Sequence, residues 1–105
     1  MRIFHIPAYT DNYIWVMQSG SDISIIDPGD ASPVLDHIKN NDLNIVDILL
    51  THHHFDHVGG TLELKKHISG KVYGPVGDIN GVDIQVAEND EVKTLEYKFS
   101  VLETP

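Results

Sequence analysis

Thr51-His52-His53-His54-Phe55-Asp56-His57-Val58-Gly59-Gly60 is the stretch around which this chain is organised. It places four of the seven histidines and one carboxylate within the six residues 52–57. It follows directly on Ile45-Val46-Asp47-Ile48-Leu49-Leu50, a run with the composition of a buried strand. From Gly59-Gly60 onward the apolar spacing becomes helical. The sequence therefore predicts that the histidines lie in a loop between a strand and a helix.

The residues before this loop predict a strand, a helix and a second strand in that order. Ile23–Ile26 is a nearly continuous β-branched run that stops at Asp27-Pro28-Gly29, which has turn chemistry. Ser32-Pro33 is typical of an N-cap followed by a first helical residue, and Asn40-Asn41 would end that helix. A βαβ unit crosses over right-handedly and makes its strands parallel. Asp27 is therefore predicted to lie at the carboxyl end of a strand, beside residues 45–50.

Strands and turns account for most of the remaining chain. Arg2–Ile6, ended by Pro7, and Tyr13–Met17 are predicted to form a hairpin. A helix is predicted from the histidine loop up to Gly70, as its C-terminal glycine. Strands are predicted over residues 71–73, 82–86 and 95–101, and residues 88–91 as a solvated acidic turn. The pattern indicates an α/β fold with a mixed, α+β-like sheet.

Composition limits the partners of the chain. Seven Lys+Arg against 16 Asp+Glu give a formal net charge of −9, which argues against nucleic acid and against an anionic membrane surface. No apolar run approaches membrane-spanning length, and the start of the chain does not look like a signal peptide. The absence of cysteine excludes disulfides and thiolate metal sites and fits the cytoplasm. Any metal would be held by imidazole and carboxylate groups.

The donor types in the histidine stretch suit divalent metals, Zn²⁺ first and Fe²⁺ or Mn²⁺ as alternatives. In an extended segment residues two apart point the same way, so His52 and His54 can reach one ion. Asp56 and His57 come after a bend, too near for all four side chains to reach one tetrahedral ion without strain, and two adjacent metals explain the spacing better. The chemistry would be metal-assisted hydrolysis by a metal-activated hydroxide. Asp56 is the predicted catalytic residue, anchoring a metal and orienting that hydroxide.

Simpler interpretations of these residues are also available. A histidine run can be an expression tag or an adventitious metal site, but this run is internal and follows a buried strand. His5 is expected to be a packed or edge residue, and His37 and His67 to be solvated helix positions. Asp27 has two interpretations that stay open: a carboxylate that hydrogen-bonds a ligating imidazole, or a cap of the turn that follows it.

The motif His52-x-His54-x-Asp56-His57, with Thr51 before it and Val58-Gly59-Gly60 after it, resembles the signature of the metallo-β-lactamase superfamily. Together with residues 10–15 and 26–31 it resembles glyoxalase II, the hydroxyacylglutathione hydrolases. The resemblance implies His52 and His54 on one metal, Asp56 and His57 on a second, and hydrolysis of S-D-lactoylglutathione to glutathione and D-lactate in methylglyoxal detoxification.

The same resemblance implies that residues 1–105 are the N-terminal half of an αββα sandwich, a mixed sheet with helices on one face. In the family the strand that resembles residues 99–105 runs into Gly-His-Thr, so the further metal ligands and the glutathione-binding residues are expected beyond Pro105. The chain alone is therefore expected to bind metal weakly, to hydrolyse poorly and to self-associate through an exposed sheet face. A non-catalytic half-domain and another hydrolase of the superfamily are the alternatives.

Overall fold

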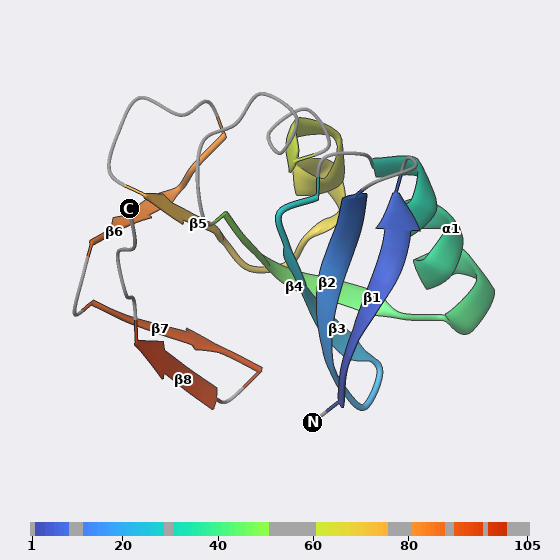
Figure 1. Cartoon of the computed structure of the whole chain (residues 1–105), viewed down its shortest axis with the longest axis horizontal. Helices are drawn as coiled ribbons and strands as arrows, with labels where there is room; N and C mark the ends of the chain where they lie inside the picture. The colour runs from blue at the N-terminus through green and yellow to red at the C-terminus, as the bar shows by residue number, and fades with distance from the viewer. Residues whose placement is uncertain are drawn as a thin grey trace.

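The computed structural model describes residues 2–8, 12–28, 31–50, 61–75, 81–87, 90–95 and 97–100 (Figure 1). Their regular elements are, in chain order, β1 Arg2–Ala8, β2 Asn12–Ser19, β3 Asp22–Ile26, α1 Ala31–Asn41, β4 Asn44–Leu49, the 3₁₀ helix η1 Lys65–His67, β5 Val72–Pro75, β6 Ile84–Val86, β7 Glu91–Thr94 and β8 Tyr97–Ser100. Residues 61–64 are α-helical and lead into η1. Within these residues no helix has the length and hydropathy needed to cross a bilayer.

Strands β1 to β6 form one sheet in sequence order. The pairs β1–β2 and β2–β3 are antiparallel, whereas β3–β4, β4–β5 and β5–β6 are parallel. The βαβ unit β3–α1–β4 and the N-terminal hairpin are thus confirmed, and the sheet is mixed as predicted. Parallel pairing brings the carboxyl ends of β3, β4 and β5 to one edge of the sheet.

Both helical segments cover the same face of this sheet. Val34 of α1 and Leu64 of residues 61–64 belong to one hydrophobic cluster with Ile25, Ile48 and Val72 of the sheet, and all five are fully buried. The prediction of helices on one face is confirmed. At the β1 end α1 packs through His37, whose ring lies 5.3 Å from that of Phe4, so His37 is half-buried rather than solvated.

The hairpin β7–β8 is attached to the opposite face, as Figure 1 shows. Buried Thr94 donates a hydrogen bond from Oγ1 to Oδ2 of Asp47 over 2.6 Å and is also hydrogen-bonded to Ser24 Oγ. The backbone N–H of Lys71 donates to the other oxygen, Asp47 Oδ1, over 2.8 Å. A buried carboxylate is tolerated when its oxygens accept hydrogen bonds. Thr94 therefore attaches the hairpin to β4 through Asp47 and to β3 through Ser24.

Several strands differ from the sequence prediction: the strand predicted over residues 82–86 is β6 Ile84–Val86, and that predicted over 95–101 is described as β8 Tyr97–Ser100. Strand β1 continues through Pro7 to Ala8, because β1 lies at the sheet edge, where a residue without an N–H is tolerated. Strand β7 was not predicted, and its first residue, Glu91, corrects the turn predicted over residues 88–91. In β7 Val92 and Thr94 are buried and Glu91 and Lys93 are exposed, and Thr94 is held by its hydrogen bond to Asp47.

The helix after the histidine loop also ends earlier than predicted. It finishes with η1 at His67, and Ile68 is already extended, with φ −90° and ψ 152°. Gly70 is not in the left-handed region and does not act as a C-terminal cap. Its N–H instead donates to Val46 O over 2.7 Å, and a Cβ at this position would lie 2.1 Å from Asp47 Oδ1. The glycine is thus required by a strand neighbour, not by the helix.

Candidate metal centre

The predicted metal ligands His52, His54, Asp56 and His57 all lie in the histidine segment, residues 51–60, which is outside the described residues. Their roles stay predictions. Pro105 is also outside the described residues, and the expectation that the substrate-binding residues lie beyond it stays a prediction as well. The structure does describe the residues on both sides of the histidine segment, and these determine where its two ends are held.

The first end is held at the carboxyl ends of three parallel strands. Leu50 is buried, and its N–H donates to the carbonyl of Tyr73 in β5 over 2.8 Å. On the other side of β4, the N–H of Asp27 donates to the carbonyl of Leu49 over 2.9 Å. The histidine segment therefore begins at the edge of the sheet where α/β folds place ligands.

Asp27 lies where the sequence predicted, at the end of β3 beside the end of β4. Its φ of 51° is in the left-handed region, which aspartate tolerates better than most residues, and this conformation ends the extended backbone of β3. The backbone N–H of Asp27 is bonded to Leu49, which is three residues before His52 in the sequence. This position is compatible with a carboxylate that supports a ligating imidazole, a role that stays a prediction.

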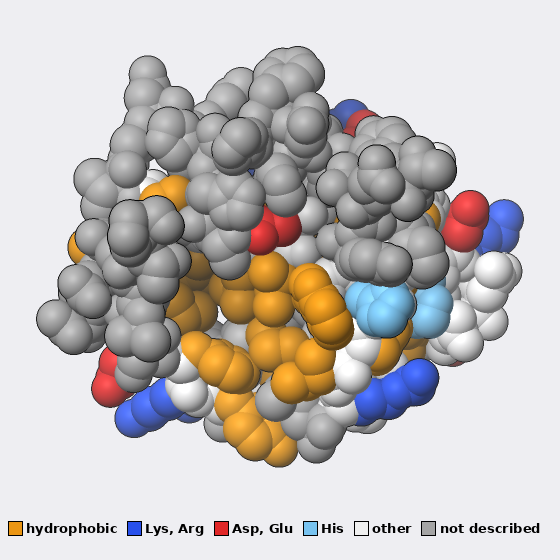
Figure 2. All heavy atoms as spheres, viewed as in Figure 1, with side chains coloured by type: hydrophobic (Ala, Val, Ile, Leu, Met, Phe, Trp, Pro, Cys, Tyr) orange, Lys and Arg blue, Asp and Glu red, His pale blue; other side chains and the backbone are white. Residues whose placement is uncertain are grey.

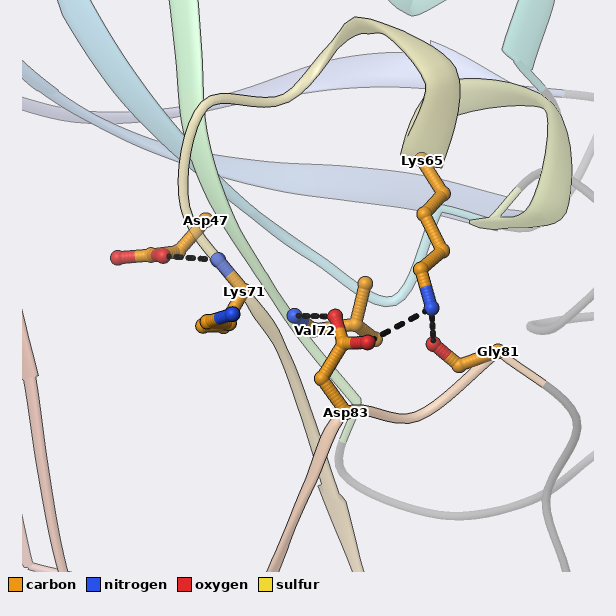
Figure 3. Close-up of polar contacts among 6 residues, drawn as sticks. All are labelled: Asp47, Lys65, Lys71, Val72, Gly81 and Asp83. Atoms are coloured by element: carbon orange, nitrogen blue, oxygen red, sulfur yellow. Dashed lines mark hydrogen bonds and ion pairs between the residues drawn. The ribbon is translucent and has the colours of Figure 1, made fainter.

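The histidine segment is followed by a helix, which one lysine bonds to the residues before β6. Thr61 and Leu64 are fully buried, which seats the helix on the sheet. Lys65 then donates from Nζ to Asp83 Oδ1 over 2.8 Å and to the carbonyl of Gly81 over 2.9 Å (Figure 3). The helix that follows the histidine segment is thereby bonded to the residues just before β6.

Asp83 connects this lysine to β5. Its Oδ2 accepts the N–H of Val72 over 2.9 Å, while its own N–H donates to the carbonyl of Val72 over 2.9 Å. The hydrogen bond from Lys65, followed by that from Val72, lowers the pKa of the Asp83 carboxyl below its ordinary value. Asp83 is therefore ionised throughout the neutral range. Nothing local in the sequence indicated this pair, because its members are 18 residues apart.

Tyr73 faces the sheet side opposite the helices at the same edge. Burial and, secondly, the negative charge of Asp47 raise the pKa of its phenol above the ordinary value. The phenol is neutral at physiological pH and can donate a hydrogen bond.

The donor set fits a divalent metal. Within the described part of the chain no three histidine, aspartate or glutamate side chains lie close enough to hold an ion. The histidine segment supplies three predicted imidazoles and one predicted carboxylate, the borderline donors that zinc, iron and manganese accept. Its position between a strand end and a helix start suits a ligand-bearing loop.

Comparison with known sequences gives a consistent family. Residues 10–81 match the family model described as the metallo-beta-lactamase superfamily. The chain is 42% identical over its whole length to a hydroxyacylglutathione hydrolase of Pseudomonas fluorescens, 43% to one of Pseudomonas syringae and 45%, over 99% of its length, to one of Hahella chejuensis. It spans only 43%, 42% and 41% of these relatives.

Comparison with solved structures supports the fold. The BLEG-1 B3 metallo-beta-lactamase superposes with a TM-score of 0.82 at 24% identity, over 99% of this chain and 62% of that one. ETHE1 from Myxococcus xanthus superposes with a TM-score of 0.80 at 25% identity, over 100% of this chain and 49% of that one. Both matches extend over nearly all of the chain, so the fold does not depend on the histidine motif alone.

Proposed function

The chain belongs to the metallo-beta-lactamase superfamily, and we propose that it carries the first part of the metal centre of a hydroxyacylglutathione hydrolase. The substrate would be a glutathione thioester such as S-D-lactoylglutathione, hydrolysed to glutathione and D-lactate in methylglyoxal detoxification. The observation that carries this proposal is the anchoring of the histidine segment: the stretch with the four predicted metal ligands begins where β3, β4 and β5 end. Relatives named hydroxyacylglutathione hydrolase favour this substrate class over others in the superfamily. The cytoplasmic location belongs to the same proposal.

The residue roles follow from the donor types. His52 and His54 would hold one divalent ion, and Asp56 and His57 a second; zinc is the first choice and iron or manganese the alternatives. When bound, such ions supply a nucleophile at neutral pH and polarise the substrate carbonyl. Asp56 would in addition accept a hydrogen bond from the attacking water and so orient it. Asp27 would hold an imidazole in position from the end of β3.

Metal content and thioester hydrolysis test this function on the purified 105-residue chain. We expect the chain to take up zinc after chelator treatment, because imidazole and carboxylate groups are donors that zinc accepts. Hydrolysis of S-D-lactoylglutathione, followed by loss of thioester absorbance, should depend on added metal. A chain that takes up no divalent metal contradicts the proposal, and hydrolysis of a β-lactam in place of the thioester indicates another hydrolase of the superfamily.

A second proposal, self-association, rests on the sheet face opposite the helices. Residues paired across five strands place Trp15, Ile26, Leu49, Tyr73 and Ile84 in one row, here called the apolar row. Trp15 is 47% exposed and Ile84 40%, while the three between them are half-buried. Figure 2 shows a continuous hydrophobic area between the hairpin β7–β8 and β2. A second copy of the chain, offering the same row, would cover it by twofold pairing.

Ile84→Lys is the variant that tests this association. It should shift a concentration-dependent dimer toward monomer in sedimentation velocity, because it places a charge in the apolar row. Leu62→Lys is the matched control, since Leu62 is 41% exposed but lies on the helical segment 61–64. The net charge of −9 opposes pairing, so added salt should favour the dimer of the unchanged chain. A monomer at all concentrations, or equal effects of both variants, would contradict the proposal.

A further inference from the structure

We propose that Lys65 and Asp83 are positioning residues that set the geometry of the histidine segment for metal binding; this inference rests on the proposed function. The pair lies outside the predicted ligand set: Lys65 follows His57 by eight residues, and Asp83 lies immediately before β6. Its effect on the ligands would be transmitted through the helix that ends the segment.

The residues on both sides of the histidine segment are hydrogen-bonded, directly or through one carboxylate, to the same strand, β5. At the first end, the N–H of Leu50 donates to Tyr73 O over 2.8 Å. At the second end, Lys65 bonds Asp83 Oδ1, and the Oδ2 of the same carboxylate accepts the N–H of Val72, the residue before Tyr73. Two consecutive residues of β5 are therefore linked to the two flanks of the segment, Tyr73 directly to Leu50 and Val72 through Asp83 to Lys65.

We expect Lys65 to act by fixing the position of the helix, and not by adding to the stability of the fold. The lysine and aspartate side chains are 36% and 30% exposed, so their ion pair is partly screened and contributes little to stability by itself. The ammonium nevertheless has two acceptors, Asp83 Oδ1 and the carbonyl of Gly81, which both come shortly before β6 in the sequence. Gly81, with φ 97°, also lies so close to the helix that a Cβ there would be 2.9 Å from the Leu62 side chain. These contacts hold the helix against the residues that immediately precede β6.

Metal binding is sensitive to such positioning. Four predicted ligands occur within six residues, and the last of them, His57, is only four residues before the helical segment 61–64, so a shift of that segment would be passed to the ligands through a short stretch of chain. Groups that orient metal ligands typically change affinity by about 10- to 100-fold when they are removed. Lys65 and Asp83 are expected at the lower end of this range because they act through the backbone.

The test compares Lys65→Met with Lys66→Met in the 105-residue chain. Lys66 is the next residue and pairs across an exposed contact with Glu63 at 3.4 Å, so its substitution removes the same charge without removing a bond to Asp83. Zinc affinity is measured by competition with a chromophoric chelator. Lys65→Met should weaken binding about tenfold and Lys66→Met less than about twofold. Lys65→Arg, which keeps the donors, should restore most of the affinity, and Asp83→Asn should weaken it as Lys65→Met does.

A spectroscopic measurement separates positioning from a general loss of stability. With cobalt(II) at saturating concentration, Lys65→Met should change the visible absorption spectrum, whereas Thr94→Ala, which weakens the fold at β7, should lower the unfolding temperature and leave the spectrum unchanged. Equal zinc affinities and cobalt spectra for Lys65→Met and Lys66→Met would overturn the positioning role alone. Failure of the unchanged chain to bind either metal would overturn the proposed function and, with it, this inference.

Discussion

Gly70→Ala is expected to lower the free energy of unfolding by about 3 kcal/mol, at the upper end of the usual cost of overpacking. The added Cβ would lie 2.1 Å from Asp47 Oδ1 and 2.6 Å from the carbonyl oxygen of Val46. Asp47 cannot turn away without losing the hydrogen bonds from Lys71 N and Thr94 Oγ1, and the Val46 carbonyl belongs to β4. The backbone itself must therefore move, which also weakens the bond from Gly70 N to Val46 O. Urea unfolding followed by circular dichroism measures the change.

Gly20→Ala is the control for this experiment. Gly20 has a φ of 64°, and a Cβ there would meet nothing within 4 Å. The control should cost only the conformational strain of a non-glycine residue, about 1 kcal/mol. If the Gly70→Ala chain is no less stable than the Gly20→Ala chain, the packing around Asp47 adjusts without cost. The predicted loss in the free energy of unfolding would then be wrong.

The double substitution His52→Ala/His54→Ala is expected to weaken zinc binding by more than about 100-fold, since it removes both imidazoles assigned to one ion and even outer partners of metal ligands are worth about 10- to 100-fold. Isothermal titration with zinc, after removal of metal by a chelator, should show at least one site fewer per chain. The loss should be accompanied by a lower unfolding temperature in the presence of zinc, because a bound metal stabilises only the folded state.

His67→Ala provides the comparison for the histidine variants. His67 lies exposed at the end of η1, ten residues after His57, and is not a predicted ligand. Its substitution should leave zinc stoichiometry and affinity unchanged. If the His52→Ala/His54→Ala chain binds zinc as the unchanged chain does, the ligand assignment is wrong and the metal-dependent function loses its basis.

The elements that could be predicted from sequence are those whose pattern is local. The runs Ile23–Ile26 and residues 45–50 predicted two buried parallel strands because residues in such strands are apolar on both faces. Strand β7 was missed because its short alternation of Glu91 and Lys93 with Val92 and Thr94 follows directly on the acidic run that predicts a turn, and because the buried partner of Thr94, Asp47, is 47 residues away. For the candidate site, the donor types in residues 52–57 were visible directly, while the pair Lys65–Asp83 was not.

Residue types and spacings of a few positions were enough to indicate the family, to predict the donor chemistry of the histidine segment and to predict the βαβ unit before it. What holds that segment, and why certain residues are required, became clear only from the folded chain. Thr94 meets Ser24 over 70 positions and Asp47 over 47, and Lys65 meets Asp83 over 18. A hydrogen bond depends on where two atoms lie in space, and periodicity along the chain does not carry that information. Gly70 shows this most directly: its position suggested a helix cap, but its requirement comes from the oxygens of Val46 and Asp47 in a neighbouring strand.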